Sequence, residues 1–379
     1  MIKKQDGGFS LPKSPRIAGI IAEYNPFHYG HAWQIKEAKK ILNPDLTIII
    51  LGGNYTQRGE MSVLRRADKV NLALNFGADL VVGIPFYNNI QAVKEFALGS
   101  VKVAQQIGVT DLVFGTEIPE FHYQEQAHRY FVSNSAKHPK IFLKNANFAS
   151  NIAQIFAKFD ISINQSNHLL ALYYAIAAEE LNFKINFVPL KRLSISGISS
   201  HKIRKLLKEN RYEDIVNLVP SETLSAIIPN AVNKFEATFK LVKSRLLLND
   251  YNQFSSFFLF NQELFYRFRR AAEVSNSYEE FIHIVKTKRY TLTRIKRNYL
   301  YLLLEITKKE VMNSNSIEVW GFNKKGQKYL STIKKEVNLI TNLQKSVYRY
   351  NKVLRDEYHF NQFYDYIMDT SPSKIVIKR

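Results

Sequence analysis

The stretch RIAGIIAEYNPFHYGHAWQIKEAKKIL, residues 16–42, carries the pattern that decides the fold. Its first seven residues form an apolar run of the length of a buried strand, and residues 31–42 repeat apolar positions with helical spacing. Four more short apolar runs alternate with helical segments; they are LTIIIL (46–51), DLVVGI (79–84), DLVF (111–114) and KINFV (184–188). This β-α alternation predicts an α/β fold with a Rossmann-like parallel sheet, helices on both faces and ligands at the carboxyl ends of the strands.

The pattern changes near residue 220, where long helical segments rich in Lys, Arg, Tyr and Phe replace the alternation. We therefore expect two domains, an α/β domain at 16–219 and a mainly α-helical, basic domain at 220–379. Residues 1–15 mix charged residues with Gly and Pro and lack the apolar core of a signal peptide, so a flexible basic tail is expected there.

The composition of the 379-residue chain limits its environment and its chemistry. With 46% hydrophobic residues it can bury a large core, yet no stretch approaches the ~20 apolar residues of a membrane span. The absence of cysteine excludes disulfides, zinc-thiolate sites and thiol catalysis. A cytoplasmic protein without membrane contact is therefore expected.

The net charge is the most informative number in the composition. The chain has 53 Lys and Arg against 33 Asp and Glu, a formal charge of +20. Such an excess attracts polyanions through counterion release. A Lys-rich composition shared by a whole proteome would produce the same excess, so composition alone does not choose between that origin and a nucleic-acid partner.

The loop between the first strand and the first helix contains two histidines three residues apart, in HYGH (28–31). His28 and His31 can point into one cleft at a helix N-terminus, where backbone amides favour a phosphate. Gly30 allows close backbone approach, and imidazoles there can donate hydrogen bonds to an α-phosphate and a departing pyrophosphate. A surface pair or a metal-binding pair has the same spacing, but no third ligand accompanies the histidines, so no metal ligands are assigned.

A second motif, ISGISSHKIRKLL at 195–207, has a serine-rich turn that opens a basic helix. Ser199 and Ser200 can cap the helix and hold phosphate oxygens, while Lys202 or Arg204 neutralises a leaving pyrophosphate. Taken alone, the commoner meaning of this pattern is an ordinary N-cap followed by solvated basic residues.

Together the two motifs resemble the signatures H-x-G-H and I-S-S-x-x-I-R of a nucleotidyltransferase superfamily, in the same order. Further segments make the chain similar to the tRNA(Met) cytidine acetate ligase family; they are EYNPFHYGH (23–31), GGNYTQRGEMS (52–62), GADLVVGIPF (77–86), FGTE (114–117), QSN (165–167), PLKR (189–192), KRYTLTR (288–294) and VWGFNKKG (319–326). The resemblance covers nearly the whole chain apart from the first fifteen residues.

This resemblance implies a ligase that works in two steps. Acetate attacks the α-phosphate of ATP to give acetyl-adenylate and pyrophosphate, and the acetyl group then passes to N4 of the wobble cytidine of elongator tRNA(Met). Mg²⁺ is expected to accompany ATP, and no obligate protein partner is evident. Residues 16–219 would be the nucleotidyltransferase domain, and residues 220–379 the domain that binds tRNA.

The resemblance also transfers site residues, position by position. His28, His31 and Arg204 would be catalytic. The positions that match the ATP site are Ile21, Ala22, Glu23, Tyr24, Asn25, Pro26, Phe27, Tyr29, Gly30, Gln34, Gly115, Asn167, Lys191, Arg192, Ser199 and Ser200.

Two further sets of residues are candidates for contact with the other substrates. Gln57 and Arg58 are expected to position acetate, although Arg58 could equally form a structural salt bridge with Glu60 or another carboxylate. The segment 286–306 offers a basic stripe interleaved with aromatic residues, and its alternative is a solvated cationic helix face whose aromatics are core. The candidates for tRNA contact are Lys288, Arg289, Tyr290, Arg294 and Arg297, with Lys286, Lys296 and Tyr299 beside them.

Three positions depart from the family pattern. Gly83 stands where the family usually has Glu, His168 follows Asn167 where Asp is usual, and His201 replaces a small hydroxyl residue. A lost acid at 168 and a bulky residue at 201 could weaken ATP binding. Because of these three departures, a catalytically degenerate descendant that still binds tRNA is one alternative. A small-molecule adenylyltransferase of the same superfamily is the other, although such an enzyme would not need the large basic helical domain.

Overall fold

The computed structural model describes residues 12, 14–135, 156, 165–192, 198–308, 316–341 and 352–378. Most of the expected tail, residues 1–11 and 13, lies outside the described residues. The same holds for 193–197, which include the start of the second motif.

All five strands expected from the apolar runs are present. They are β1 (Ile17–Ala22), β2 (Leu46–Leu51), β3 (Leu80–Gly83), β4 (Asp111–Thr116) and β5 (Asn186–Lys191). These strands pair in parallel in the order β5-β4-β1-β2-β3. The predicted α/β class with a parallel sheet is therefore confirmed.

Helices cover both faces of this sheet because alternate strand residues point to opposite sides. Ile49 and Leu51 of β2 pack in one core with the first two helices, whereas Ile48 and Ile50 pack in a second core on the other face. The helices of this part of the chain are α1 (Tyr29–Leu42), α2 (Arg66–Asn75), α3 (Phe86–Asn89), α4 (Val93–Gln106), α5 (Tyr123–Ser135), α7 (Ser166–Glu180) and α8 (Ser200–Lys208). Residues of α4 and α7 line the second core.

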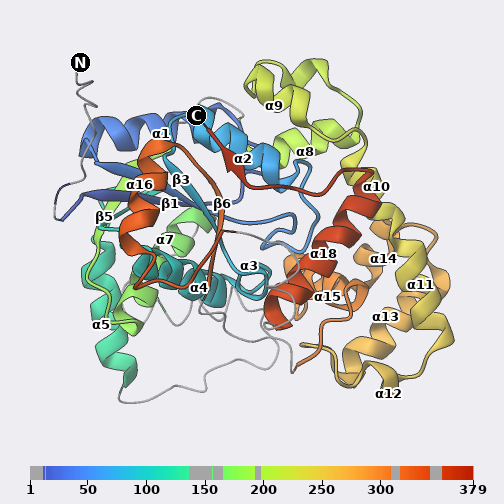
Figure 1. The fold of residues 1–379 in the computed structure, drawn as a ribbon. Coiled ribbons are helices and arrows are strands. Elements are labelled where there is room, and N and C mark those ends of the chain that lie inside the picture. Colours follow the sequence, from blue (N-terminus) through green and yellow to red (C-terminus); the bar gives the residue numbers. More distant parts are fainter. Residues whose placement is uncertain are drawn as a thin grey trace.

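The chain then forms the expected group of helices, which Figure 1 shows gathered beside the sheet. They are η1 (Glu213–Ile215), α9 (Ser221–Ala226), α10 (Ala231–Ala237), α11 (Phe239–Leu248), α12 (Tyr251–Phe254), α13 (Gln262–Val274), α14 (Tyr278–Val285) and α15 (Leu292–Leu303). Their buried side chains continue the core that lies under α1 and α2. None of the helices in the described ranges is both long and apolar enough to cross a membrane.

The division at residue 220 needs a correction, because the chain returns to the sheet after the helices. β6 (Ile317–Phe322) pairs antiparallel with β3, and β7 (Leu339–Ile340) and β8 (Val376–Ile377) pair with β6. The segment VWGFNKKG therefore belongs to the sheet and to the start of α16 (Lys324–Ile333), not to the helical region.

The last long helix, α18 (Lys352–Met368), lies between the sheet and helices α11 and α14 in Figure 1. Its residues contact the segment that follows β2: the Tyr55 hydroxyl donates to the carbonyl of Phe360 at 2.5 Å, and the Tyr364 hydroxyl donates to the carbonyl of Ser62 at 2.9 Å. The helix thus fixes this segment from the side of the helical region.

Candidate active site

The strand order places the candidate site at the carboxyl ends of the parallel strands, beside β1 and β4. From β1 the chain proceeds to β2 and β3 on one side, and then crosses to β4 on the other side of β1. The loops after β1 and β4 therefore leave the sheet in different directions, and the crevice between them is where ligands of such sheets bind. The two histidines follow β1, and Gly115 and Glu117 lie at the end of β4.

The two histidine rings are stacked in the segment that follows β1. Their centroids are 3.7 Å apart with an interplanar angle of 16°. The backbone N–H of His28 donates to Nδ1 of His31 at 3.2 Å, so the neutral form of His31 carries its proton on Nε2. Burial lowers the pKa of His28 to about 4 and that of His31 well below its usual range. At neutral pH both imidazoles are uncharged hydrogen-bond donors.

The glycine and the aromatic residues of the motif hold this stack in place. A β-carbon at Gly30 would lie 2.9 Å from Cε1 of His28, so only glycine leaves room for that ring. The His31 ring is packed against Tyr24 and Phe27, with centroids 4.8 and 5.6 Å away. Tyr24 adopts a φ of 49°, a left-handed conformation that is uncommon for a bulky residue.

The second motif contacts the first directly. Ser199 caps α8, since its hydroxyl accepts from the backbone N–H of Lys202 at 3.2 Å, as the sequence predicts. The Ser200 hydroxyl donates to the carbonyl of Pro26 at 3.4 Å, and Nη1 of Arg204 donates to the carbonyl of Asn25 at 2.8 Å. The structure therefore brings Arg204 to the loop that carries the histidines.

The third group of candidate ATP residues meets at the carboxylate of Glu117. The Asn167 amide donates to it at 2.5 Å, the backbone N–H of His168 at 3.2 Å, and Nη1 of Arg192 lies 3.7 Å away. Glu117 is the last residue of the FGTE segment, and nothing in the sequence indicates a role for it. Lys191 and Arg192 are exposed, so their charges face solvent at this side of the crevice.

The remaining candidate ATP residues divide by exposure. Tyr24, Asn25, Pro26 and Phe27 are buried, so their side chains shape the loop from inside. The residues with at least partly exposed surface are Ile21, Ala22, Glu23, Tyr29, Gly30, Gln34, Gly115 and Ser200.

Lys69, which the sequence did not indicate as a site residue, connects the segments that follow β1 and β2. Lys69 of α2 is fully buried, and its ammonium donates to the carbonyls of Glu23 at 2.9 Å, Gly52 at 3.0 Å and Gly53 at 2.6 Å. Burial lowers the pKa of Lys69 and raises that of Glu23. In the sequence Lys69 resembles any helical lysine, and no pattern marks it.

The expected acetate residues lie in a loop at 56–60. The Gln57 backbone N–H donates to the Glu23 carboxylate at 2.6 Å, and its side-chain amide donates to the carbonyl of Gln91 at 2.9 Å. Arg58 is exposed and has no ion pair within the described part of the chain. The alternative of an Arg58–Glu60 salt bridge is not observed.

Glu60 instead pairs with Arg204, 3.4 Å away, and with Lys296 of α15. Burial alone would raise the pKa of Glu60, but these cations hold it below its usual value. The Glu60 carboxylate is therefore ionised and joins the second motif to the helical region.

The candidate tRNA residues fall into two sets. Lys286, Lys288 and Arg289 are exposed, although Arg289 pairs with Glu263 at 2.9 Å. By contrast, the rings of Tyr290 and Tyr299 are 2% and 0% exposed, which corrects the expectation that they stack on bases. Tyr290 is covered by Arg294, whose guanidinium carbon is 4.8 Å from the ring centroid.

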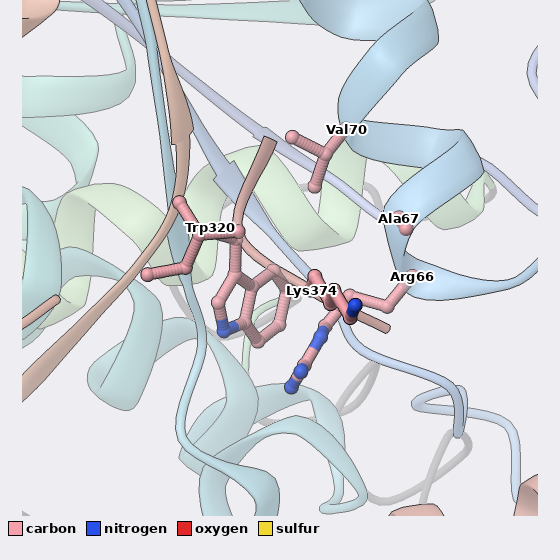
Figure 2. Close-up of a pocket in the computed structure, with 6 residues that line it drawn as sticks. Arg66, Ala67, Val70, Trp320 and Lys374 are labelled. Atoms are coloured by element: carbon pink, nitrogen blue, oxygen red, sulfur yellow. The ribbon is translucent and has the colours of Figure 1, made fainter. Parts of the chain in front are cut away.

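Two of the three departures from the family pattern, Gly83 and His168, are explained by local packing. A β-carbon at Gly83 would lie 3.0 Å from Cη2 of Trp320, so the indole fills the space of a side chain there. Figure 2 shows the Arg66 side chain beside this indole, with the guanidinium carbon 4.9 Å from the ring centroid. His168 is buried, with Nδ1 2.9 Å from the Tyr123 hydroxyl, and His201 is exposed on the first turn of α8.

A parallel sheet with stacked histidines at its switch point and a serine-capped basic helix beside them defines a nucleotidyltransferase. In agreement, the HIGH Nucleotidyl Transferase family model matches residues 16–376. The proteins named tRNA(Met) cytidine acetate ligase from Latilactobacillus sakei and Leuconostoc mesenteroides are 32% and 33% identical, over 86% of this chain and 86% and 88% of theirs. The chain therefore belongs to the tRNA(Met) cytidine acetate ligase family, as the sequence motifs indicate.

Solved structures agree on the fold. Thermotoga maritima TmcAL bound with alpha-thio ATP superposes with a TM-score of 0.81 at 24% identity, covering 96% of this chain and all of that chain. Its apo form gives a TM-score of 0.82 over the same shares.

Proposed function

We propose that this protein activates acetate with ATP and acetylates N4 of the wobble cytidine of elongator tRNA(Met). The observation that carries the proposal is the stacked His28–His31 pair at the switch point of the sheet, in a chain of the tRNA(Met) cytidine acetate ligase family. Arg204 reaches the same loop from α8 and adds a positive charge.

In the first step, a carboxylate oxygen of acetate attacks the α-phosphorus of ATP, and the bond to the bridging oxygen of the pyrophosphate breaks. Negative charge grows on the leaving pyrophosphate. Neutral imidazoles donate hydrogen bonds to these oxygens without a charge of their own, while Arg204 neutralises part of the charge. Mg²⁺ would accompany ATP. Among the described residues no group of three or more His, Asp or Glu side chains is suited to a metal, and no metal ligand is assigned. Phosphates of a nucleotide bind Mg²⁺ directly.

In the second step, the cytidine amine attacks the acetyl carbonyl of acetyl-adenylate, AMP leaves, and the amine loses a proton. The tRNA would be held by phosphate contacts from the exposed cations Lys288 and Arg289, with Arg294 beside them. Since both ATP and tRNA are cytoplasmic substrates, the protein is expected to act in the cytoplasm.

The test is to incubate the protein with ATP, labelled acetate and bulk tRNA and then to analyse the nucleosides. Labelled N4-acetylcytidine should form, and it should disappear with His31→Ala but persist with His283→Ala, a matched change at an exposed histidine of α14. AMP joined to a small molecule would indicate an adenylyltransferase. Intact tRNA binding with no acetate-dependent pyrophosphate would indicate the degenerate descendant.

A further inference from the structure

We propose that Lys296 and Arg297 of α15 are positioning residues for the activation of acetate, so that the helical region completes the activation site before any tRNA is bound. This inference rests on the proposed function. The sequence places Lys296 and Arg297 on the basic stripe that is expected to face RNA. We assign them instead to the first step, the formation of acetyl-adenylate.

The loop at 56–60 has a defined shape. The backbone N–H of Thr56 donates to the carbonyl of Glu60 at 2.9 Å, and the N–H of Gly59 donates to the carbonyl of Thr56 at 3.0 Å. Gly59 has a φ of 79°, which favours glycine. These bonds form a tight turn with Gln57 and Arg58 at its tip, and the turn fixes the backbone from which the Arg58 side chain extends.

One side of this turn is packed on α15. A β-carbon at Gly59 would lie 2.7 Å from Cα of Arg297, so the two backbones are in direct contact. Nη1 of Arg297 donates to the carbonyl of Gln57 at 3.3 Å, and the Lys296 ammonium donates to the Glu60 carboxylate. Gln57, Gly59 and Glu60 of the turn are thus held by two successive residues of one helix.

The other side of the turn is held by the nucleotide site. Gln57 donates its backbone N–H to Glu23, which directly follows β1, and Glu60 pairs with Arg204 of α8. The turn is therefore held on one side by α15 and on the other by Glu23 and Arg204 of the two nucleotidyltransferase motifs. A shift of α15 would displace Arg58 relative to the histidine pair.

Lys296 and Arg297 both have partners inside the protein. The side chains of Lys296 and Glu60 are 22% and 18% exposed, and the Lys296 ammonium is paired with this carboxylate, which Arg204 also contacts. A cation that contacts RNA phosphates and releases their counterions must be exposed to solvent. Lys288 is exposed and meets this requirement, whereas Lys296 does not.

The experiment is acetate-dependent exchange of labelled pyrophosphate into ATP, with the full chain and no tRNA present. For Lys296→Met and Arg297→Met, we expect KM for acetate to rise about tenfold or more, because displaced positioning groups cost on that order, while KM for ATP stays close to wild type. Lys240→Met, at an exposed lysine of α11, is the matched control and should leave both constants unchanged. Lys296→Arg keeps the charge and should restore most of the acetate affinity.

Two results would overturn the inference while leaving the proposed function intact. The first is wild-type exchange in both variants, with only tRNA acetylation reduced. The second is an equal loss of acetate and ATP affinity together with a lower thermal midpoint, which would indicate a merely structural role. A wild-type protein that shows no acetate-dependent exchange would instead remove the proposed function, and this inference with it.

Discussion

Substituting Gly30 with Ala tests whether the stacked histidine pair is what the H-x-G-H motif maintains. The added methyl carbon would lie 2.9 Å from Cε1 and 3.0 Å from Nδ1 of His28. Carbon atoms in contact are ~3.5–4.0 Å apart, so the ring must move by about half an ångström or more. His28 is only 7% exposed and its ring is stacked on His31, so the displacement disturbs both imidazoles.

We expect kcat for acetate-dependent pyrophosphate exchange to fall about ten- to a hundredfold, since misplacing reacting groups by a fraction of an ångström to 1 Å costs on that order. The free energy of unfolding, measured in urea, should fall by only about 1–3 kcal/mol, as at other overpacked sites. Gly53→Ala is the matched control, because its methyl group would meet Trp320 at an ordinary 3.5 Å. A folded Gly30→Ala protein with wild-type kcat would refute the reasoning.

Three further outcomes are expected. Burial lowers the pKa of His28 to about 4, below the ~6.5 of an unfolded histidine, so the unfolded chain takes up this proton first as the pH falls. As the pH falls between those two values, the free energy of unfolding of the wild type should decrease by up to about 3 kcal/mol, and that of His28→Gln should not. If urea unfolding showed the same dependence of this free energy on pH for both proteins, the prediction would be wrong. Glu117→Gln should raise KM for ATP about tenfold, because a charged acceptor shared by Asn167 and Arg192 is lost; an unchanged KM in the exchange assay would count against it. Gly83→Ala should lower the unfolding free energy by about 1–3 kcal/mol, and Trp320→Phe should restore part of it, whereas strictly additive losses would show that the two sites are not coupled.

The sheet and the histidine site are predictable from the sequence because their signals are local. All six residues of β2 are buried, so the strand appears as an uninterrupted apolar run. The spacing of His28, Gly30 and His31 is likewise contained in four residues. The serine cap of α8 depends on contacts three residues apart and is equally visible.

The groups that connect distant segments are not predictable in this way. Lys69, Glu117 and Lys296 act through partners that are 16 to 236 residues away, and a polar residue in a helix or loop has no periodicity that marks such a partner. The expectation that Tyr290 stacks on bases was wrong for a related reason. An aromatic residue between cations produces the same sequence pattern whether its ring faces a base or the core, and only the packing of Arg294 over the ring decides.

The return of β6 to the edge of β3 has a consequence for synthesis on the ribosome. β3 ends at residue 83, but its partner strand begins at residue 317, after the whole group of helices. At typical elongation rates these ~230 residues take on the order of ten to fifty seconds, during which β3 has an open hydrogen-bonding edge. The parallel part of the sheet therefore lacks the antiparallel partner of β3 while the helical region is synthesised. A chain shortened before β6 should expose the edge of β3 and aggregate.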